Sequence, residues 1–134
     1  MVSGINATAT AIVADGNAQY RSALLDLLRR MHDLDVVAAC STASEAVELC
    51  ARHRPDILLI DAGMRGSDAL HAATVVRAAA PCTCIVFMTS GASGVLRAAE
   101  YHRQADHVIS KSEIKNSLRA VLDARRSGPC RCGG

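Results

Sequence analysis

The fold is decided by one short stretch, residues 54–61, which reads RPDILLID. Its proline disfavours helix at the residue before it, and an apolar run without a polar break follows. Such a run is typical of a strand buried on both faces of a parallel sheet, whereas a half-exposed strand alternates apolar and polar residues. We therefore expect a buried strand over residues 56–60, with Asp61 directly after it.

Further apolar runs of strand length occur at similar intervals, over residues 10–14, 35–40, 83–88 and 106–110. Apolar residues at helical spacing lie between the runs and after the last one, over residues 18–30, 44–52, 68–80, 93–104 and 113–126. Strands that alternate with helices imply right-handed crossovers and a three-layer α/β sandwich. We expect a doubly wound, parallel five-stranded sheet with the flavodoxin-like order 2-1-3-4-5.

The composition restricts the class of protein. A length of 134 residues suits one domain, which we expect over residues 9–126, with a flexible lead at 1–8 and a flexible tail at 127–134. With 2 Tyr, 1 Phe and no Trp, small aliphatic residues must build the core. The net charge of +2 is too balanced for a surface that neutralises nucleic-acid phosphates.

The chain has no apolar stretch approaching the ~18 residues of a membrane span and no export signal. We therefore expect a cytoplasmic protein without membrane contact. Its cysteines are expected to be free thiols, including Cys82, whose spacing from Cys84 predicts that both face the core. Cys130 and Cys132 lie in the glycine-rich tail, where exposed thiols could oxidise, cross-link chains or bind a soft metal.

Polar side chains follow four of the five predicted strands: Asp15, Asp61, Thr89 and Lys111. The carboxyl ends of parallel strands meet at one edge of a sheet, where ligands of doubly wound folds bind. Each residue alone is typical of a solvated loop. Together, two carboxylates, a hydroxyl and an ammonium can hold a divalent cation and accept a phosphoryl group on a carboxylate.

In this order and spacing, three segments resemble the CheY-like receiver domain of bacterial two-component response regulators. They are residues 15–28 (DGNAQYRSALLDLL), 54–61 (RPDILLID) and 105–111 (ADHVISK). The first is most similar to the subfamily that usually carries a LuxR-type helix-turn-helix, and the likeness covers roughly residues 9–126. The length leaves no room for that helix-turn-helix, so we expect any DNA output to belong to another chain or a removed segment.

The resemblance implies a role for each residue at the strand ends. Asp61 would accept a phosphoryl group from a histidine kinase or a phosphotransfer protein, and Thr89 and Lys111 would contact that group. Asp15, Asp61 and the backbone carbonyl of Gly63 would hold Mg²⁺. Such a domain is not an enzyme beyond its own phosphorylation and dephosphorylation.

The resemblance also implies an output surface, formed by residues 93–104, 106–110 and 113–126. This face would relay the signal to other proteins and would be the surface of a homodimer. No contact of this domain with nucleic acid is expected.

Two positions depart from the family pattern. Gly16 stands where family members usually have a second acidic residue, so Mg²⁺ binding should be weak, and Val108 stands where they commonly have an aromatic residue. The alternative is therefore a degenerate pseudo-receiver that binds partners or dimerises without phosphorylation. A small flavodoxin-like enzyme or nucleotide binder is less favoured, because no glycine-rich phosphate loop follows the first predicted strand.

Overall fold

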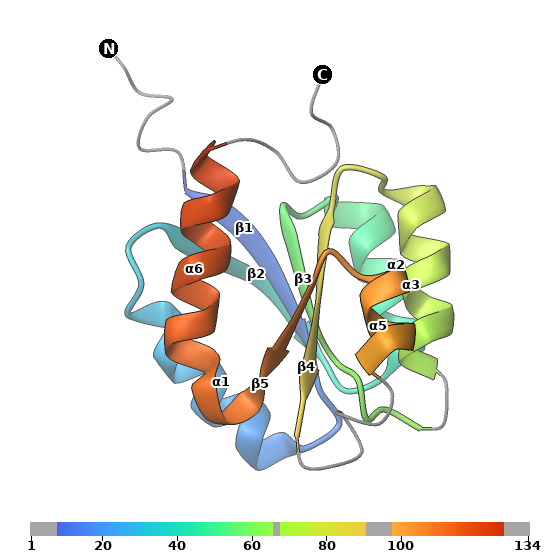
Figure 1. Ribbon diagram of the computed structural model, residues 1–134, viewed down its shortest axis with the longest axis horizontal. Helices are drawn as coiled ribbons and strands as arrows, with labels where there is room; N and C mark the ends of the chain where they lie inside the picture. The colour runs from blue at the N-terminus through green and yellow to red at the C-terminus, as the bar shows by residue number, and fades with distance from the viewer. Residues whose placement is uncertain (1–7, 66–67, 91–97, 128–134) are drawn as a thin grey trace.

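The computed structural model describes residues 8–65, 68–90 and 98–127, and Figure 1 shows their arrangement. A parallel sheet has the order β2-β1-β3-β4-β5, which confirms the predicted topology. Its strands are β1 (Ala9–Ala14), β2 (Leu34–Cys40), β3 (Ile57–Asp61), β4 (Cys84–Thr89) and β5 (His107–Ser110). The lead expected at 1–8 and the tail expected at 127–134 lie, apart from Thr8 and Ser127, outside the described residues.

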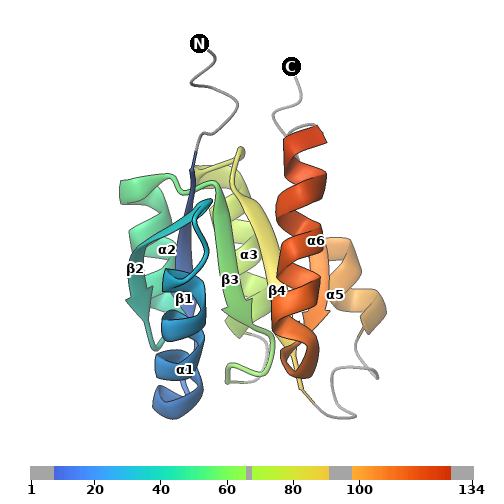
Figure 2. The same cartoon turned by 90° about the vertical axis from the view of Figure 1, so that its left-hand side faces the viewer.

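Helices cover both faces of the sheet, as Figures 1 and 2 show, with α1 and α6 on one face and α2, α3 and α5 on the other. They are α1 (Ala18–Arg29), α2 (Ala43–His53), α3 (Asp68–Ala79), α5 (Ala98–Gln104) and α6 (Ile114–Ser127). A 3-10 turn, η2 (Lys111–Glu113), connects β5 to α6. The first part of the helix expected over residues 93–104 lies outside the described residues. Each helix that the structure describes is too short or too polar to span a bilayer.

Within the described residues, element boundaries differ from the expected ones by at most one residue. Asp61 and Thr89 are the last residues of β3 and β4, not the first residues after them. Helix α2 begins at Ala43 because Thr42 caps it: the Thr42 hydroxyl oxygen accepts the backbone N–H of Glu45 at 3.1 Å, and the Glu45 carboxylate accepts the Thr42 hydroxyl at 3.0 Å. The first bond satisfies a backbone donor that an α-helix leaves unpaired at its start, and the second holds the Thr42 hydroxyl in place.

The core consists of two apolar layers, one on each face of the sheet. Residues 57–60 of β3 are fully buried and contribute alternately to the two layers, which confirms the double-sided burial expected from their unbroken apolar run. Alanine, valine, leucine and isoleucine dominate both layers, and Phe87 and Tyr101 are the aromatic residues of the layer beneath α2, α3 and α5. The sheet is therefore rigidly held, and its carboxyl edge is a fixed platform for polar side chains.

The cysteines follow the expectation only in part. Cys40, Cys50 and Cys84 are buried free thiols, and burial raises the pKa of the first two to about 11 and about 12. The expectation for Cys82 was wrong, because it is exposed and disulfide-bonded. Cys82 lies in the turn before β4, so the alternation of the strand does not direct it into the core. Cys130 and Cys132 lie outside the described residues.

Candidate functional site

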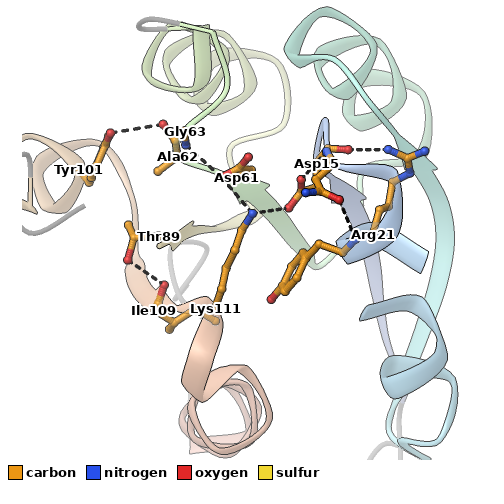
Figure 3. Close-up of polar contacts among 11 residues, drawn as sticks. Asp15, Arg21, Asp61, Ala62, Gly63, Thr89, Tyr101, Ile109 and Lys111 are labelled. Atoms are coloured by element: carbon orange, nitrogen blue, oxygen red, sulfur yellow. Dashed lines mark hydrogen bonds and ion pairs between the residues drawn. The ribbon is translucent and has the colours of Figure 1, made fainter. Parts of the chain in front are cut away.

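Three of the predicted site residues meet at the carboxyl edge of the sheet (Figure 3). Asp15 follows β1 and Asp61 ends the neighbouring β3, so pairing of the two strands places the carboxylates side by side. The Nζ atom of Lys111 lies 2.8 Å from Oδ2 of Asp15 and 3.4 Å from Oδ1 of Asp61. Asp15 is fully buried, and the other two side chains are 14–16% exposed. The ammonium thus bridges two carboxylates at a site shielded from most solvent.

Asp15 is held in place through its backbone and one carboxylate oxygen. Its Oδ1 accepts the backbone N–H of Asn17 at 2.8 Å, and its backbone carbonyl accepts Nη1 of Arg21 at 2.6 Å. Asn17 also caps α1, accepting the backbone N–H of Tyr20 at 2.9 Å. Sequence reasoning assigned no role to Arg21. The signal that could have identified Arg21 is its position about one turn into α1, which begins three residues after Asp15.

Tyr20 covers the bridging ammonium. Nζ of Lys111 lies 4.4 Å from the centre of the Tyr20 ring, a cation–π arrangement. The Tyr20 hydroxyl is buried and has no hydrogen-bond partner among the described residues. Burial, with smaller contributions from Asp15 and Asp61, raises the pKa of Tyr20 to about 12. Sequence reasoning also assigned no role to Tyr20, because its position in α1 is typical of a residue that only packs the helix.

Asp61 is the accessible carboxylate of the pair. Its Oδ1 accepts the backbone N–H of Gly63 at 3.0 Å. A cavity of about 780 Å³ opens in front of it, lined by the loops after β1, β2 and β3, with Gly16, Gly63 and Arg65 among the lining residues. A small phosphorylated molecule or a phosphorylated side chain can therefore reach Asp61, whereas buried Asp15 cannot be a nucleophile toward an outside group.

Thr89 lies at the same edge but does not contact the charged cluster. Its hydroxyl donates to the backbone carbonyl of Ile109 in β5 at 3.3 Å (Figure 3). The hydroxyl is therefore bonded to the neighbouring strand, and it must exchange that acceptor before it can donate to a group on Asp61.

The oxygen atoms at this site are of the kind that Mg²⁺ takes as ligands. Oδ2 of Asp15 is buried without a hydrogen bond from the described residues, although the Lys111 ammonium pairs with it. Mg²⁺ takes one or two carboxylates together with phosphate oxygens and water. No group of three or more acidic, histidine or cysteine side chains converges within the described residues. A Cβ at Gly16 would approach the Ser41 carbonyl at 3.6 Å, an ordinary contact, so the site has room for the acid that it lacks.

This arrangement has the parts that phosphoryl transfer to a carboxylate needs. A carboxylate attacks phosphorus readily only when nearby cations offset its charge and that of the phosphoryl oxygens. Lys111 supplies one fixed cation, and Asp15 holds it in place from below. Gly63 supplies a backbone donor beside Asp61. Preorganised charges and donors of this kind are the main source of catalysis in such reactions.

Comparisons with known proteins identify the family. The family model described as the response regulator receiver domain matches residues 11–123. The chain is 26% identical over 117 residues to the transcriptional regulatory protein DesR of Bacillus subtilis, which covers 85% of this chain and 58% of DesR. The chain spans less than two thirds of the length of that curated relative.

Solved structures share the fold. The signal receiver domain of NarL from Mycobacterium tuberculosis has a TM-score of 0.76 and 23% identity, covering 88% of this chain and 96% of that one. A chain from the complex of the P1 domain of CheA3 with CheY6 of R. sphaeroides has a TM-score of 0.71 and 24% identity, covering 87% and 98%. At these identities the likeness establishes the architecture alone.

Proposed function

The chain belongs to the response regulator receiver domain family of two-component systems, and we propose that Asp61 accepts its phosphoryl group. The observation that carries this proposal is the convergence at Asp61: an accessible carboxylate faces a cavity and lies 3.4 Å from the Lys111 ammonium. A receiver domain is a signalling module, which fits a protein that is not an enzyme in its own right.

The proposed donor is a phosphohistidine of a histidine kinase or phosphotransfer protein. A carboxylate oxygen of Asp61 forms a bond to phosphorus while the phosphorus–nitrogen bond breaks, and the imidazole leaves with that electron pair. Lys111 offsets the charge of the transferred group, and Thr89 exchanges the Ile109 carbonyl for a phosphoryl oxygen. The complex of CheY6 with the P1 domain of CheA3 supports a partner of this class.

Asp15 and Asp61, with the backbone carbonyl of Gly63, are the residues that would hold Mg²⁺. When bound, the ion supplies positive charge that offsets the phosphoryl oxygens. Because Gly16 adds no carboxylate, we expect weak Mg²⁺ binding. Arg21 keeps the Asp15 backbone in position from the opposite side.

We place the output on the face formed by α5, β5 and α6, called the output face below. A cavity of about 480 Å³ lies on it, and its lining includes His102 from α5, Val108 from β5 and Ala120 from α6. A shape that combines a shallow hollow with small side chains suits another protein surface, a second copy of this chain included. Output partners in the cytoplasm would meet the domain there, without direct nucleic-acid contact.

Incubation with acetyl phosphate and Mg²⁺ followed by intact-mass measurement tests the proposal. We expect a gain of about 80 Da for one phosphoryl group. Asp61→Asn should abolish the gain, whereas the matched control Asp68→Asn, an exposed acid lining the same cavity, should keep it. No gain at high acetyl phosphate and Mg²⁺ would overturn the assignment of Asp61.

A pseudo-receiver is the second candidate, favoured by the missing acid at Gly16 and by the Lys111 ammonium that already neutralises much of the pocket. It predicts no mass gain and partner binding or dimerisation that is indifferent to Asp61→Asn. Sedimentation with and without a beryllofluoride mimic separates the two: the first candidate predicts an Asp61-dependent change, and the second predicts none.

A further inference from the structure

Tyr101 connects the phosphoacceptor loop to helix α5. Its side chain is buried, with 4% of the residue exposed, and its hydroxyl donates to the backbone carbonyl of Ala62 at 3.3 Å (Figure 3). Its ring packs edge-on against Phe87 of β4, with ring centres 5.2 Å apart and an angle of 87° between the planes. Tyr101 therefore holds α5 against both the sheet and the residue that follows Asp61.

The accepting carbonyl belongs to a peptide unit that also contacts Asp61. The carbonyl of Ala62 and the N–H of Gly63 are the two polar ends of one planar peptide group. The N–H end donates to Oδ1 of Asp61 at 3.0 Å, and the carbonyl end accepts from Tyr101. Because the group is rigid and trans, a rotation that follows a change at Asp61 must move the acceptor of the Tyr101 hydroxyl.

Other bonds restrict how this peptide can move. The N–H of Ala62 donates to the carbonyl of Met88 in β4 at 2.8 Å, so the start of the loop is fixed to the sheet. Rotation of the following peptide is then the motion left to the loop. Its consequences reach α5 through Tyr101, alongside the contacts between α3 and Gln104 of α5.

Val108 of β5 does not provide an aromatic contact to Phe87. It faces the same apolar layer as Phe87 and Tyr101, at a strand position paired with Phe87, but its side chain has no hydroxyl and no ring. The aromatic ring that packs on Phe87 comes from α5 instead. The helix is thus connected to the phosphoacceptor loop directly.

We propose that the Ala62–Gly63 peptide and Tyr101 couple the state of the Asp61 carboxylate to the position of α5, which makes Tyr101 a positioning residue for the output face. The proposal rests on Asp61 being the phosphoacceptor of the proposed function. The coupling itself needs no phosphoryl group, because it begins with the hydrogen bond between Asp61 and Gly63.

A double-mutant cycle in the full chain tests the coupling without any phosphodonor. The variants are Asp61→Ala, which removes the acceptor of the Gly63 N–H, Tyr101→Phe, which removes only the hydroxyl, and the pair. Heteronuclear NMR follows amide shifts and hydrogen exchange in residues 102–105, with amides of β1 as internal reference. The control Tyr20→Phe removes a buried hydroxyl that has no hydrogen-bond partner among the described residues.

We expect Asp61→Ala to shift the α5 amides, and we expect this shift to fall by half or more in the Tyr101→Phe background. Tyr101→Phe alone should shift the Gly63 amide and speed α5 exchange about fivefold relative to β1, as loss of one hydrogen bond implies. Tyr20→Phe should leave α5 exchange unchanged. A global loss of packing would instead speed exchange in β1 equally.

Additive effects of Asp61→Ala and Tyr101→Phe on α5 would overturn the proposal, as would an unchanged Gly63 amide in Tyr101→Phe. Failure of the acetyl phosphate experiment has a different signature, because it removes the mass gain and leaves the cycle intact. The two inferences can therefore fail separately.

Discussion

Two aspartates occupy opposite ends of the same sheet, and their surroundings differ in completeness. At the amino edge, Oδ2 of Asp56 accepts the backbone N–H of Thr10 at 2.8 Å and its hydroxyl at 3.2 Å, while Oδ1 pairs with Arg125 at 2.6 Å. At the carboxyl edge, Oδ2 of Asp15 has an ion pair with Lys111 but no hydrogen bond from the described residues.

The two aspartates also differ in how deeply they are buried and in how their carboxylate oxygens are paired. The Asp56 side chain is 36% exposed and each of its oxygens has a partner of its own, whereas the fully buried Asp15 shares the Lys111 ammonium with Asp61. One ammonium between two carboxylates leaves a negative charge that a bound cation can offset. The amino edge therefore stabilises the fold, and the carboxyl edge keeps charge available for binding.

The largest expected effect tests the amino edge. Asp56→Ala removes the acceptor of two Thr10 donors and leaves Arg125 unpaired, so we expect the free energy of unfolding to fall by about 2 kcal/mol. Urea unfolding followed by circular dichroism measures it. The control Asp35→Ala, at an exposed position of β2, should cost less than about 0.5 kcal/mol. Equal losses of unfolding free energy in the two variants would contradict a stabilising role for the contacts of Asp56.

The next effect tests the carboxyl edge. Gly16→Asp adds a third carboxylate where a side chain has room, because φ of Gly16 lies outside the left-handed region and the nearest atom is 3.6 Å from a built Cβ. We expect Mg²⁺ affinity to rise roughly tenfold, equivalent to about 1.4 kcal/mol. Calorimetric titration measures it, with Gly16→Asn as the control of equal shape and no charge. A similar gain in both variants would show that charge is not what the site lacks.

A pH titration reads the negative charge of the two carboxylates through Tyr20. Burial, Asp15 and Asp61 favour the neutral phenol and raise its pKa to about 12 from its ordinary value of 10.0. In the unfolded chain Tyr20 no longer has this preference for the neutral form. Its contribution to the free energy of unfolding is therefore fully present below about pH 10 and is lost as the pH rises toward about 12. Tyrosinate absorbance follows the titration. Asp61→Asn should lower the Tyr20 pKa, and Tyr20→Phe should remove the step near pH 12; the absence of that step from the native protein would contradict the geometry.

The smallest effect lies beside Asp56. Arg54 ends α2 in the left-handed region, with φ 45° and ψ 61°, and is alone in this among the non-glycine residues that the structure describes. Arg54→Gly removes the steric cost of this conformation in the folded state, and it also raises the conformational entropy of the unfolded chain. The first effect is the larger, so we expect the free energy of unfolding to rise by about 0.5 kcal/mol. Thermal unfolding measures the change. Arg54→Ala should not stabilise, and a gain as large as that of glycine would rule out the left-handed conformation as the cause.

The fold was predictable because its signals are local and repeated. The unbroken apolar run of β3 indicates burial on both faces, and Pro55 fixes where the preceding helix ends. Element ends were less predictable, since Thr42 and Glu45 define the start of α2 through a pair of hydrogen bonds that apolar periodicity does not encode. The prediction for Cys82 failed because β4 begins two residues later, at Cys84, so the alternation of strand side chains does not apply to Cys82.

The site was predictable as a set of residue types and not as a set of contacts. Strand ends in a parallel sheet must meet at one edge, so the strand pattern alone predicts that Asp15, Asp61 and Lys111 lie close together. It could not place the Thr89 hydroxyl, which donates to Ile109. Tyr20 was also beyond its reach, because a ring over an ammonium depends on how α1 lies against η2.

The sequence by itself determined the strand order, the double-sided burial of β3 and the chemistry at the sheet edge. Periodicity and strand-end position are properties of the chain, and physical rules convert them into topology. Only the tertiary structure decided that Asp15 and Asp61 share one ammonium, and that Tyr101 carries the aromatic ring packed on Phe87. Those outcomes depend on ångström-scale distances between elements far apart in sequence, and packing sets such distances.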